Sequence, residues 1–92
     1  MRLILRERAA DDLEAIFDWI ARDNPAAASR TVSRLRERMG QLLLPETTRM
    51  GRPGRVRGTR ELLEAPYLIV YEVDDRREEV VIFSIVHTAR GR

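Results

Sequence analysis

The chain has 92 residues and a formal net charge of +2, which fits one small domain and excludes two domains that each bury a useful core. It has no cysteine and one histidine, so disulfides and the usual Cys/His metal sites are excluded. No apolar run approaches the roughly 20 residues that cross a bilayer, and the apolar N-terminal stretch is too short for a signal sequence. We therefore expect a single domain over residues 1–92 that lies in the cytoplasm, contacts no membrane, and binds no metal and no cofactor.

The first part of the chain predicts a short strand followed by a helix. The strand is the apolar run Leu3-Ile4-Leu5. From residue 9 onward, apolar residues recur at helical spacing on one stripe: Leu13, Ile16, Phe17 and Ile20. We expect Asp11 and Asp12 in the first turn of this helix, where the helix dipole favours negative charge.

The dipeptide Asn24-Pro25 predicts the start of a second helix, because Asn is a good N-cap and Pro is tolerated at the first helical position. The apolar stripe of this helix consists of Ala28, Val32, Leu35, Met39 and Leu42. Pro45 ends it. Two amphipathic helices joined by so short a connection should pack as an antiparallel hairpin, with their apolar stripes turned toward a sheet.

The second half of the chain predicts that sheet. Residues 47–58 contain three glycines and a proline, which disfavour regular structure and indicate a loop. Three strand-like runs follow, at 59–63, 67–73 and 79–87, and their short connections favour an antiparallel meander. The expected fold class is α+β with the order β-α-α-β-β-β, in which an N-terminal helical hairpin packs on one face of a mainly antiparallel four-stranded sheet.

Strand alternation predicts which side chains face the helices. In the middle run these are Tyr67, Ile69, Tyr71 and Val73, and in the last run they are Val81, Phe83, Ile85 and His87. The opposite face would carry Glu72 and Ser84, yet most of its other residues are apolar. An open face that is largely apolar suggests that a partner covers it.

Charge is unevenly distributed. Residues 49–60 contain five arginines and no acid: Arg49, Arg52, Arg55, Arg57 and Arg60. Such a segment is either a binding surface for an anionic partner or an ordinary solvated loop, and composition does not choose between them. The acidic residues Asp11, Asp12, Glu14 and Asp18 are expected to form a solvated helix face and not a cation site.

Catalytic motifs are sparse. No serine or cysteine lies in a nucleophile elbow, and the glycines of 51–58 lack the lysine of a nucleotide-binding loop. Trp19 flanks the first apolar stripe, where it is either core-edge packing or a partner contact. His87 is either a packed structural residue or a general base.

Several segments together resemble the ParE branch of the RelE/ParE toxins. They are Asp12-Leu13, Asn24-Pro25-Ala26-Ala27, Gly51-Arg52-Pro53-Gly54-Arg55-Val56-Arg57-Gly58-Thr59-Arg60-Glu61-Leu62, Pro66-Tyr67-Leu68-Ile69-Val70-Tyr71-Glu72-Val73 and Val86-His87-Thr88-Ala89-Arg90. One departure is Arg6-Glu7, where the family often begins its first helix with Ser-Pro. The resemblance implies a toxin silenced by a cognate antitoxin, and it implies either of two activities: RelE-like members cleave messenger RNA on the ribosome, whereas ParE-like members inhibit DNA gyrase.

The sequence favours the second activity. RelE-like toxins often place an arginine after the tyrosine of the middle strand, but this chain has Leu68 there, and it ends Thr88-Ala89-Arg90-Gly91-Arg92 without a late tyrosine. An apolar residue cannot stabilise a transition-state phosphate. We therefore expect a non-enzymatic gyrase inhibitor, with ribosome-dependent mRNA cleavage as the alternative. In that alternative Arg60 would grip the phosphate, Glu61 would be the base, His87 a second proton carrier and Arg90 a tail contact.

The resemblance and the charges also nominate binding residues. For the gyrase target these are Arg55, Arg57, Arg60 and Arg90. For the antitoxin, whose helix would lie on the hairpin or whose extended segment would join the sheet, they are Leu68, Val70, Trp19, Arg34 and Arg38. A third class remains open, a non-toxic protein- or nucleic-acid-binding module of the same fold that uses the stripe Arg30, Arg34 and Arg38 with the basic loop.

Overall fold

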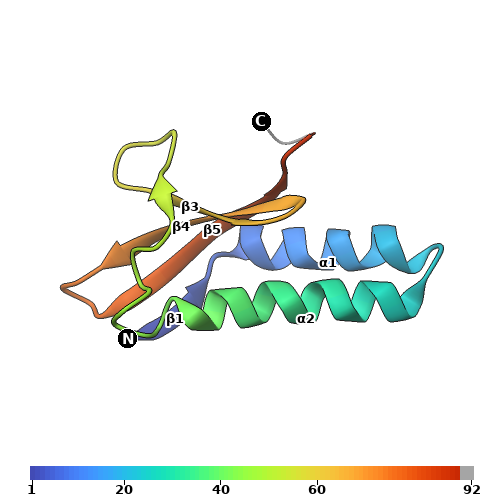
Figure 1. Ribbon diagram of the computed structural model, residues 1–92, viewed down its shortest axis with the longest axis horizontal. Helices are drawn as coiled ribbons and strands as arrows, with labels where there is room; N and C mark the ends of the chain where they lie inside the picture. Colours follow the sequence, from blue (N-terminus) through green and yellow to red (C-terminus); the bar gives the residue numbers. More distant parts are fainter. Residues whose placement is uncertain (90–92) are drawn as a thin grey trace.

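A computed structural model describes residues 1–89 and shows two layers, a helical hairpin and a sheet (Figure 1). The elements in chain order are β1 (Arg2–Leu5), α1 (Glu7–Ala21), α2 (Pro25–Gln41), β2 (Arg52–Pro53), β3 (Arg60–Glu64), β4 (Tyr67–Asp74) and β5 (Glu79–His87). The two helices run side by side and project past the sheet, which makes the molecule elongated, at 42 × 24 × 22 Å. The predicted α+β fold and its helical hairpin are confirmed.

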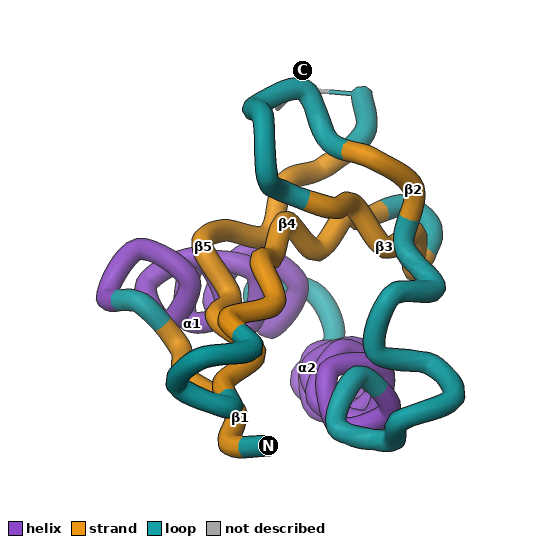
Figure 2. The backbone as a smooth tube through the Cα atoms, turned by 90° about the vertical axis from the view of Figure 1, so that its left-hand side faces the viewer, coloured by secondary structure: helices purple, strands orange, loops and turns teal. Residues whose placement is uncertain are grey.

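The sheet has the strand order β1-β5-β4-β3-β2. Only β1 and β5 pair in parallel, and the remaining neighbours are antiparallel. Figure 2 views the sheet from one end, and both helices contribute buried residues to one core on the same face of the sheet. The predicted count of four strands was one short, because Arg52 and Pro53 of the expected loop pair with β3 as β2. Pro53 is tolerated there because an edge strand can lack one backbone donor.

The first helix begins earlier than the sequence suggested. Arg6 is its N-cap without a side-chain hydrogen bond, and Glu7 is the acid of its first turn. The prediction that Asp11 and Asp12 occupy the first turn was therefore wrong. Asp12 also leaves the solvated face assigned to it, because its carboxylate accepts a hydrogen bond from the backbone N–H of Ile85 in β5.

The second helix begins where predicted. The Asn24 side chain accepts a hydrogen bond of 3.0 Å from the Ala27 N–H, and Pro25 takes the first helical position. Both features remove the cost of unsatisfied donors at a helix start. The stripe predicted for this helix lies inward, with Ala28, Leu35, Met39 and Leu42 fully buried and Val32 packed against the core.

The core lies between the hairpin and the sheet, and a β-bulge decides which residues of β5 enter it. Ile69 pairs with Ile85, but Tyr71 pairs with Ile82, so β5 carries one extra residue between these pairs. Such an insertion reverses the side-chain alternation. Ile85 therefore lies in the core as predicted, whereas Val80 and Ile82 enter it in place of Val81 and Phe83. The residues predicted from β4 are confirmed.

Candidate functional site

Within the arginine-rich segment, residues 54–59 form a tight turn between β2 and β3, which we call the arginine-rich turn. The Gly54 N–H donates to the Thr59 carbonyl at 2.8 Å, and the Thr59 N–H donates to the Val56 carbonyl at 3.0 Å. Gly58 has a φ of +86°, a conformation that side-chain-bearing residues rarely adopt. The turn is thus held in shape by its own backbone hydrogen bonds.

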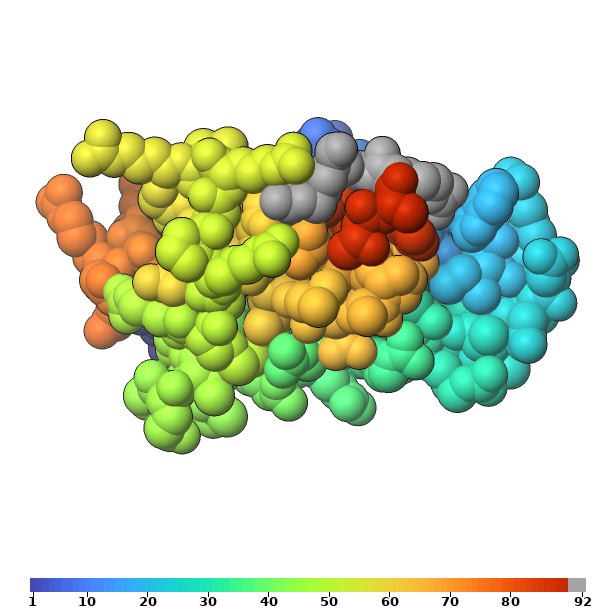
Figure 3. All heavy atoms as spheres, turned by 45° about the horizontal axis from the view of Figure 1, so that its top comes forward, coloured from blue at the N-terminus to red at the C-terminus, as the bar shows by residue number. Residues whose placement is uncertain are grey.

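The tip of this turn presents Arg55, Val56 and Arg57 to solvent. Val56 is 68% exposed. Neither Arg55 nor Arg57 forms an ion pair with an acid within residues 1–89. In Figure 3 the yellow-green atoms of this part of the chain form one margin of the visible face. Two guanidinium groups therefore flank an exposed aliphatic side chain.

Arg60 stands at the start of β3 and points to the helix side, like its cross-strand partner Tyr71. Its guanidinium donates to the carbonyl of Arg49 at 3.1 Å and to that of Gly51 at 2.7 Å. These two bonds hold the segment that leads into β2. Arg60 thus fixes the backbone just before β2 by its bonds to Arg49 and Gly51.

Tyr71 in β4 anchors the same segment from the core. Its hydroxyl accepts a hydrogen bond of 3.0 Å from the Gly51 N–H and donates one of 3.0 Å to the Thr48 carbonyl. The ring is fully buried. A Cβ at position 51 would stand 2.8 Å from the Tyr71 ring and hydroxyl, so glycine is needed for this close approach.

Glu61 follows Arg60 but points to the opposite face of the sheet, because its partner is Val70. The residue is only 5% exposed. Its carboxylate accepts hydrogen bonds of 3.3 Å from Nη2 of Arg52 and from the backbone N–H of Arg55. A buried acid therefore ties the tip of the turn to β3.

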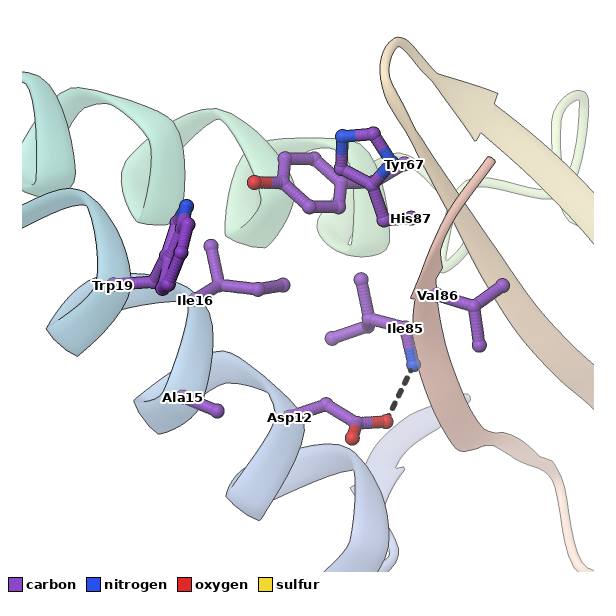
Figure 4. A pocket seen from close by; sticks show the side chains of 8 residues that line it. All are labelled: Asp12, Ala15, Ile16, Trp19, Tyr67, Ile85, Val86 and His87. Atoms are coloured by element: carbon purple, nitrogen blue, oxygen red, sulfur yellow. Dashed lines mark hydrogen bonds between the residues drawn. The ribbon is translucent and has the colours of Figure 1, made fainter. Parts of the chain in front are cut away.

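A second site is the groove between α1 and the ends of β4 and β5, with a volume of about 410 Å³ (Figure 4). It is lined by Asp12, Ala15, Ile16, Trp19, Tyr67, Ile85, Val86 and His87. Trp19 is 56% exposed, and the Arg22 guanidinium lies 5.3 Å from the centre of its ring. The groove is thus mostly apolar, with a cation at its rim.

His87 lies in this groove and not beside the arginine-rich turn. Its ring meets the edge of Tyr67 with the ring centres 5.4 Å apart. Its Nδ1 accepts a hydrogen bond of 3.1 Å from the Ala89 N–H. These contacts fit a packed histidine, with one ring nitrogen engaged by the backbone.

The other residues nominated for antitoxin binding lie on both sides of the sheet. On α2, the guanidinium of Arg34 lies 3.5 Å and that of Arg38 3.1 Å from the Glu64 carboxylate. Leu68 and Val70 belong to the face away from the helices, where Leu68 is 2% exposed and Val70 is half-buried. Arg90, nominated for either activity, lies outside the described residues.

The structure therefore places Arg55 and Arg57 in the turn between β2 and β3, where Glu61 binds the backbone of Arg55. It places His87 and Trp19 together in the groove beside α1. Sequence reasoning missed the roles of Tyr71, Val56 and Asp12. The acid of Glu61 beside five arginines was a signal for an internal ion pair, whereas nothing local marked the long-range bonds of Tyr71 and Asp12.

Within residues 1–89 no three His, Asp or Glu side chains are grouped to hold a metal, and no described helix is long and apolar enough to cross a membrane.

The family comparison agrees with this architecture. Residues 3–91 match the family described as the ParE toxin of the type II toxin-antitoxin system parDE. A Sinorhizobium fredii (strain NBRC 101917 / NGR234) protein named "Putative toxin Y4kP" is 38% identical over 82 residues, which cover 87% of this chain and 80% of that protein. This chain belongs to the ParE toxin family, within the RelE/ParE superfamily, and is thus a toxin of a type II toxin-antitoxin system.

Solved structures show the same relationship. A chain described as the chromosomal ParDE toxin-antitoxin system from P. aeruginosa is 31% identical, with a TM-score of 0.81 and 95% coverage of both chains. A chain of the RelBE2 toxin-antitoxin complex from Mycobacterium tuberculosis is 25% identical, with a TM-score of 0.69, over 94% of this chain and 95% of that one. A chain of the E. coli RelBE complex shares the fold, with 18% identity, a TM-score of 0.65 and 94% coverage of both chains.

Proposed function

We propose that this toxin acts in the cytoplasm and inhibits DNA gyrase by binding it, without breaking a covalent bond. The observation that carries the proposal is the separation of Arg60 from Glu61. They are neighbours on β3, yet Arg60 faces the helix side with Tyr71 and Glu61 faces the opposite side with Val70. A strand places consecutive side chains on opposite faces, so the two cannot meet one phosphate.

The alternative, RelE-like cleavage of messenger RNA, needs a cation and a proton carrier that converge on the same phosphate. Here the Arg60 guanidinium is bonded to two loop carbonyls and the Glu61 carboxylate to Arg52 and Arg55. His87 lies in the separate groove beside Tyr67. The nominated catalytic groups thus have structural partners, which favours binding over cleavage.

The arginine-rich turn is the proposed contact with gyrase. Arg55 and Arg57 would make it directly, since they are exposed and have no acidic partner within residues 1–89. Arg60 would act indirectly by holding the loop, and Arg90 is retained from its charge and motif position. An arginine guanidinium suits bidentate binding of carboxylates.

A cognate antitoxin is the second proposed partner, because the P. aeruginosa and M. tuberculosis relatives are described as parts of toxin-antitoxin systems or complexes. Trp19 would bury its exposed ring, and Arg34 and Arg38, which pair with Glu64, would donate their remaining N–H groups to acidic side chains of the antitoxin. Leu68 and Val70 lie across the sheet from these residues. Arg38 and Leu68 nevertheless line one hollow beside β3, so a single antitoxin segment would reach both there.

The test is gyrase supercoiling run beside translation in vitro. Wild-type toxin should block supercoiling and leave ribosome-bound message intact. The double variant Arg55→Ala, Arg57→Ala should need at least about tenfold more protein for the same inhibition, since hot-spot arginines contribute at least this much. Arg76→Ala, in the exposed β4–β5 turn, is the matched control and should inhibit like the wild type. Untouched supercoiling together with cleaved message would replace the proposal with the RelE-like activity.

The nucleic-acid-binding alternative has its own readout. Binding to bare DNA or RNA through several arginines weakens steeply as salt rises. Two members of the candidate stripe, Arg34 and Arg38, already pair with Glu64. We therefore expect no tight, salt-sensitive complex with bare nucleic acid.

A further inference from the structure

We infer that the Arg55–Arg57 tip is a preformed protein-docking element in which Val56 is the apolar centre and Glu61 is the positioning residue. The inference rests on the proposed function and adds two things to it: the chemistry of the surface that the tip fits, and the group that sets the conformation of the tip.

The exposure of Val56 identifies the kind of partner. At 68%, it is the most exposed large hydrophobic residue within residues 1–89. It stands between two arginines at the end of a turn that its own backbone bonds hold in shape. Isolated exposed apolar residues are common on surfaces, but one at the apex of an ordered, projecting turn can enter a depression without a change in the fold.

This combination fits a protein surface better than a phosphate backbone. Phosphates would bind Arg55 and Arg57 by charge and by hydrogen bonds, but they offer an aliphatic side chain between those arginines no apolar surface to pack against. A protein surface can supply an apolar depression for Val56 and a carboxylate on each side of it. The partner surface is therefore a small apolar pocket flanked by Asp or Glu side chains.

Glu61 holds the Arg55–Arg57 tip in its conformation by accepting one backbone hydrogen bond, from the Arg55 N–H. Its carboxylate accepts the Arg55 N–H at 3.3 Å while it also binds the Arg52 guanidinium. Glu61 is 5% exposed, so few water molecules reach its carboxylate to compete with these two donors. This fixes the direction in which the chain leaves β2, and hence where Val56 points. A loop already in its binding conformation has less entropy to lose on docking.

The docking role of Val56 is tested by Val56→Ser on purified gyrase, with supercoiling and direct binding as readouts. Burying a valine is worth enough that its loss should weaken both at least about tenfold. Leu44→Ser, at a residue 50% exposed in the turn after α2, is the matched control and should bind gyrase like the wild type. Unchanged inhibition by Val56→Ser, when Arg55→Ala with Arg57→Ala abolishes it, would overturn the inference and leave the proposed function standing.

The positioning role of Glu61 is tested without any target, by amide hydrogen exchange in the free protein. Glu61→Ala should speed exchange at the Arg55 N–H about tenfold, since a bond to a charged acceptor is lost. Glu61→Gln keeps an oxygen acceptor and should exchange closer to the wild-type rate. Glu79→Ala removes a second, poorly exposed strand carboxylate that pairs with an exposed arginine, Arg2, and should leave Arg55 unaffected.

The same variants separate positioning from general stability. Glu61→Ala should weaken gyrase inhibition more than Glu79→Ala even at temperatures where both are fully folded. Equal Arg55 exchange in the wild type and Glu61→Ala would overturn the positioning role. Failure of the wild type to inhibit gyrase would overturn the proposed function together with the docking role of Val56, and Arg55 exchange would still decide the role of Glu61.

Discussion

The carboxylate of Asp12 in α1 accepts a hydrogen bond of 2.9 Å from the backbone N–H of Ile85 in β5. The register of the sheet explains why a side chain is needed there. β1 pairs with β5 only as far as Ile82, so the edge of β5 beyond that point lacks a neighbouring strand. Asp12 takes the place of the missing strand and joins the helical layer to the sheet at the floor of the groove (Figure 4).

Asp12→Ala should lower the free energy of unfolding by about 1–3 kcal/mol, because the Ile85 N–H loses a charged acceptor in a part-buried position. Urea denaturation measures the change. Asp11→Ala, one residue earlier and exposed, is the control and should stay within about 0.5 kcal/mol of the wild type. Equal losses for the two variants would contradict the proposed strand-capping role of Asp12.

Tyr71→Phe should also destabilise the protein by about 1–3 kcal/mol, since it leaves the Gly51 N–H and the Thr48 carbonyl without their buried partner. Its matched control is Tyr67→Phe, which removes a hydroxyl for which the described residues provide no hydrogen bond. Thermal unfolding of both variants makes the comparison. A larger loss for Tyr67→Phe would show that the Tyr71 hydroxyl does not anchor the loop.

Asn24→Ala should cost about 1 kcal/mol of stability, because the Ala27 N–H loses its cap at the start of α2. Asn24→Asp keeps an acceptor oxygen and should lie near the wild type. Denaturant midpoints of the three proteins give the answer. If Asn24→Asp is as unstable as Asn24→Ala, the side-chain bond is not what stabilises this helix start.

Trp19→Ala should weaken binding of the cognate antitoxin by at least about tenfold, since a large exposed ring beside an apolar groove is a typical hot spot. Titration calorimetry with the purified antitoxin measures the affinity. Asp18→Ala, the exposed neighbour on the same helix, serves as the control. An unchanged affinity would remove this groove from the proposed antitoxin surface.

Local signals in the sequence predicted the elements well. The start of α2 at Pro25 and the span of β5 follow from a capping residue and from a run of β-branched residues, which act within a few positions. The resemblance carried by residues 51–62, 66–73 and 86–90, with Asp12-Leu13 and residues 24–27 upstream, predicted the family, because the order and spacing of these segments together are specific.

Long-range features were not predictable in the same way. The bulge opposite Val70 and Tyr71 depends on how β5 fits between two other strands, so the inward positions of Val80 and Ile82 could not be obtained from alternation alone. β2 was missed because two residues carry no periodicity and pair only once β3 is in place. The bond from Asp12 to Ile85 joins positions 73 apart in the chain.

The parallel pairing of β1 with β5 has a consequence for biosynthesis. Arg2 lies opposite Glu79, and β5 is an interior strand between β1 and β4. Translation must therefore proceed past residue 87 before the sheet can close, and contacts between such distant positions form slowly. A nascent chain whose residues 79–87 are still inside the ribosomal exit tunnel lacks this interior strand, so β1 and β4 have no strand to join them until those residues emerge.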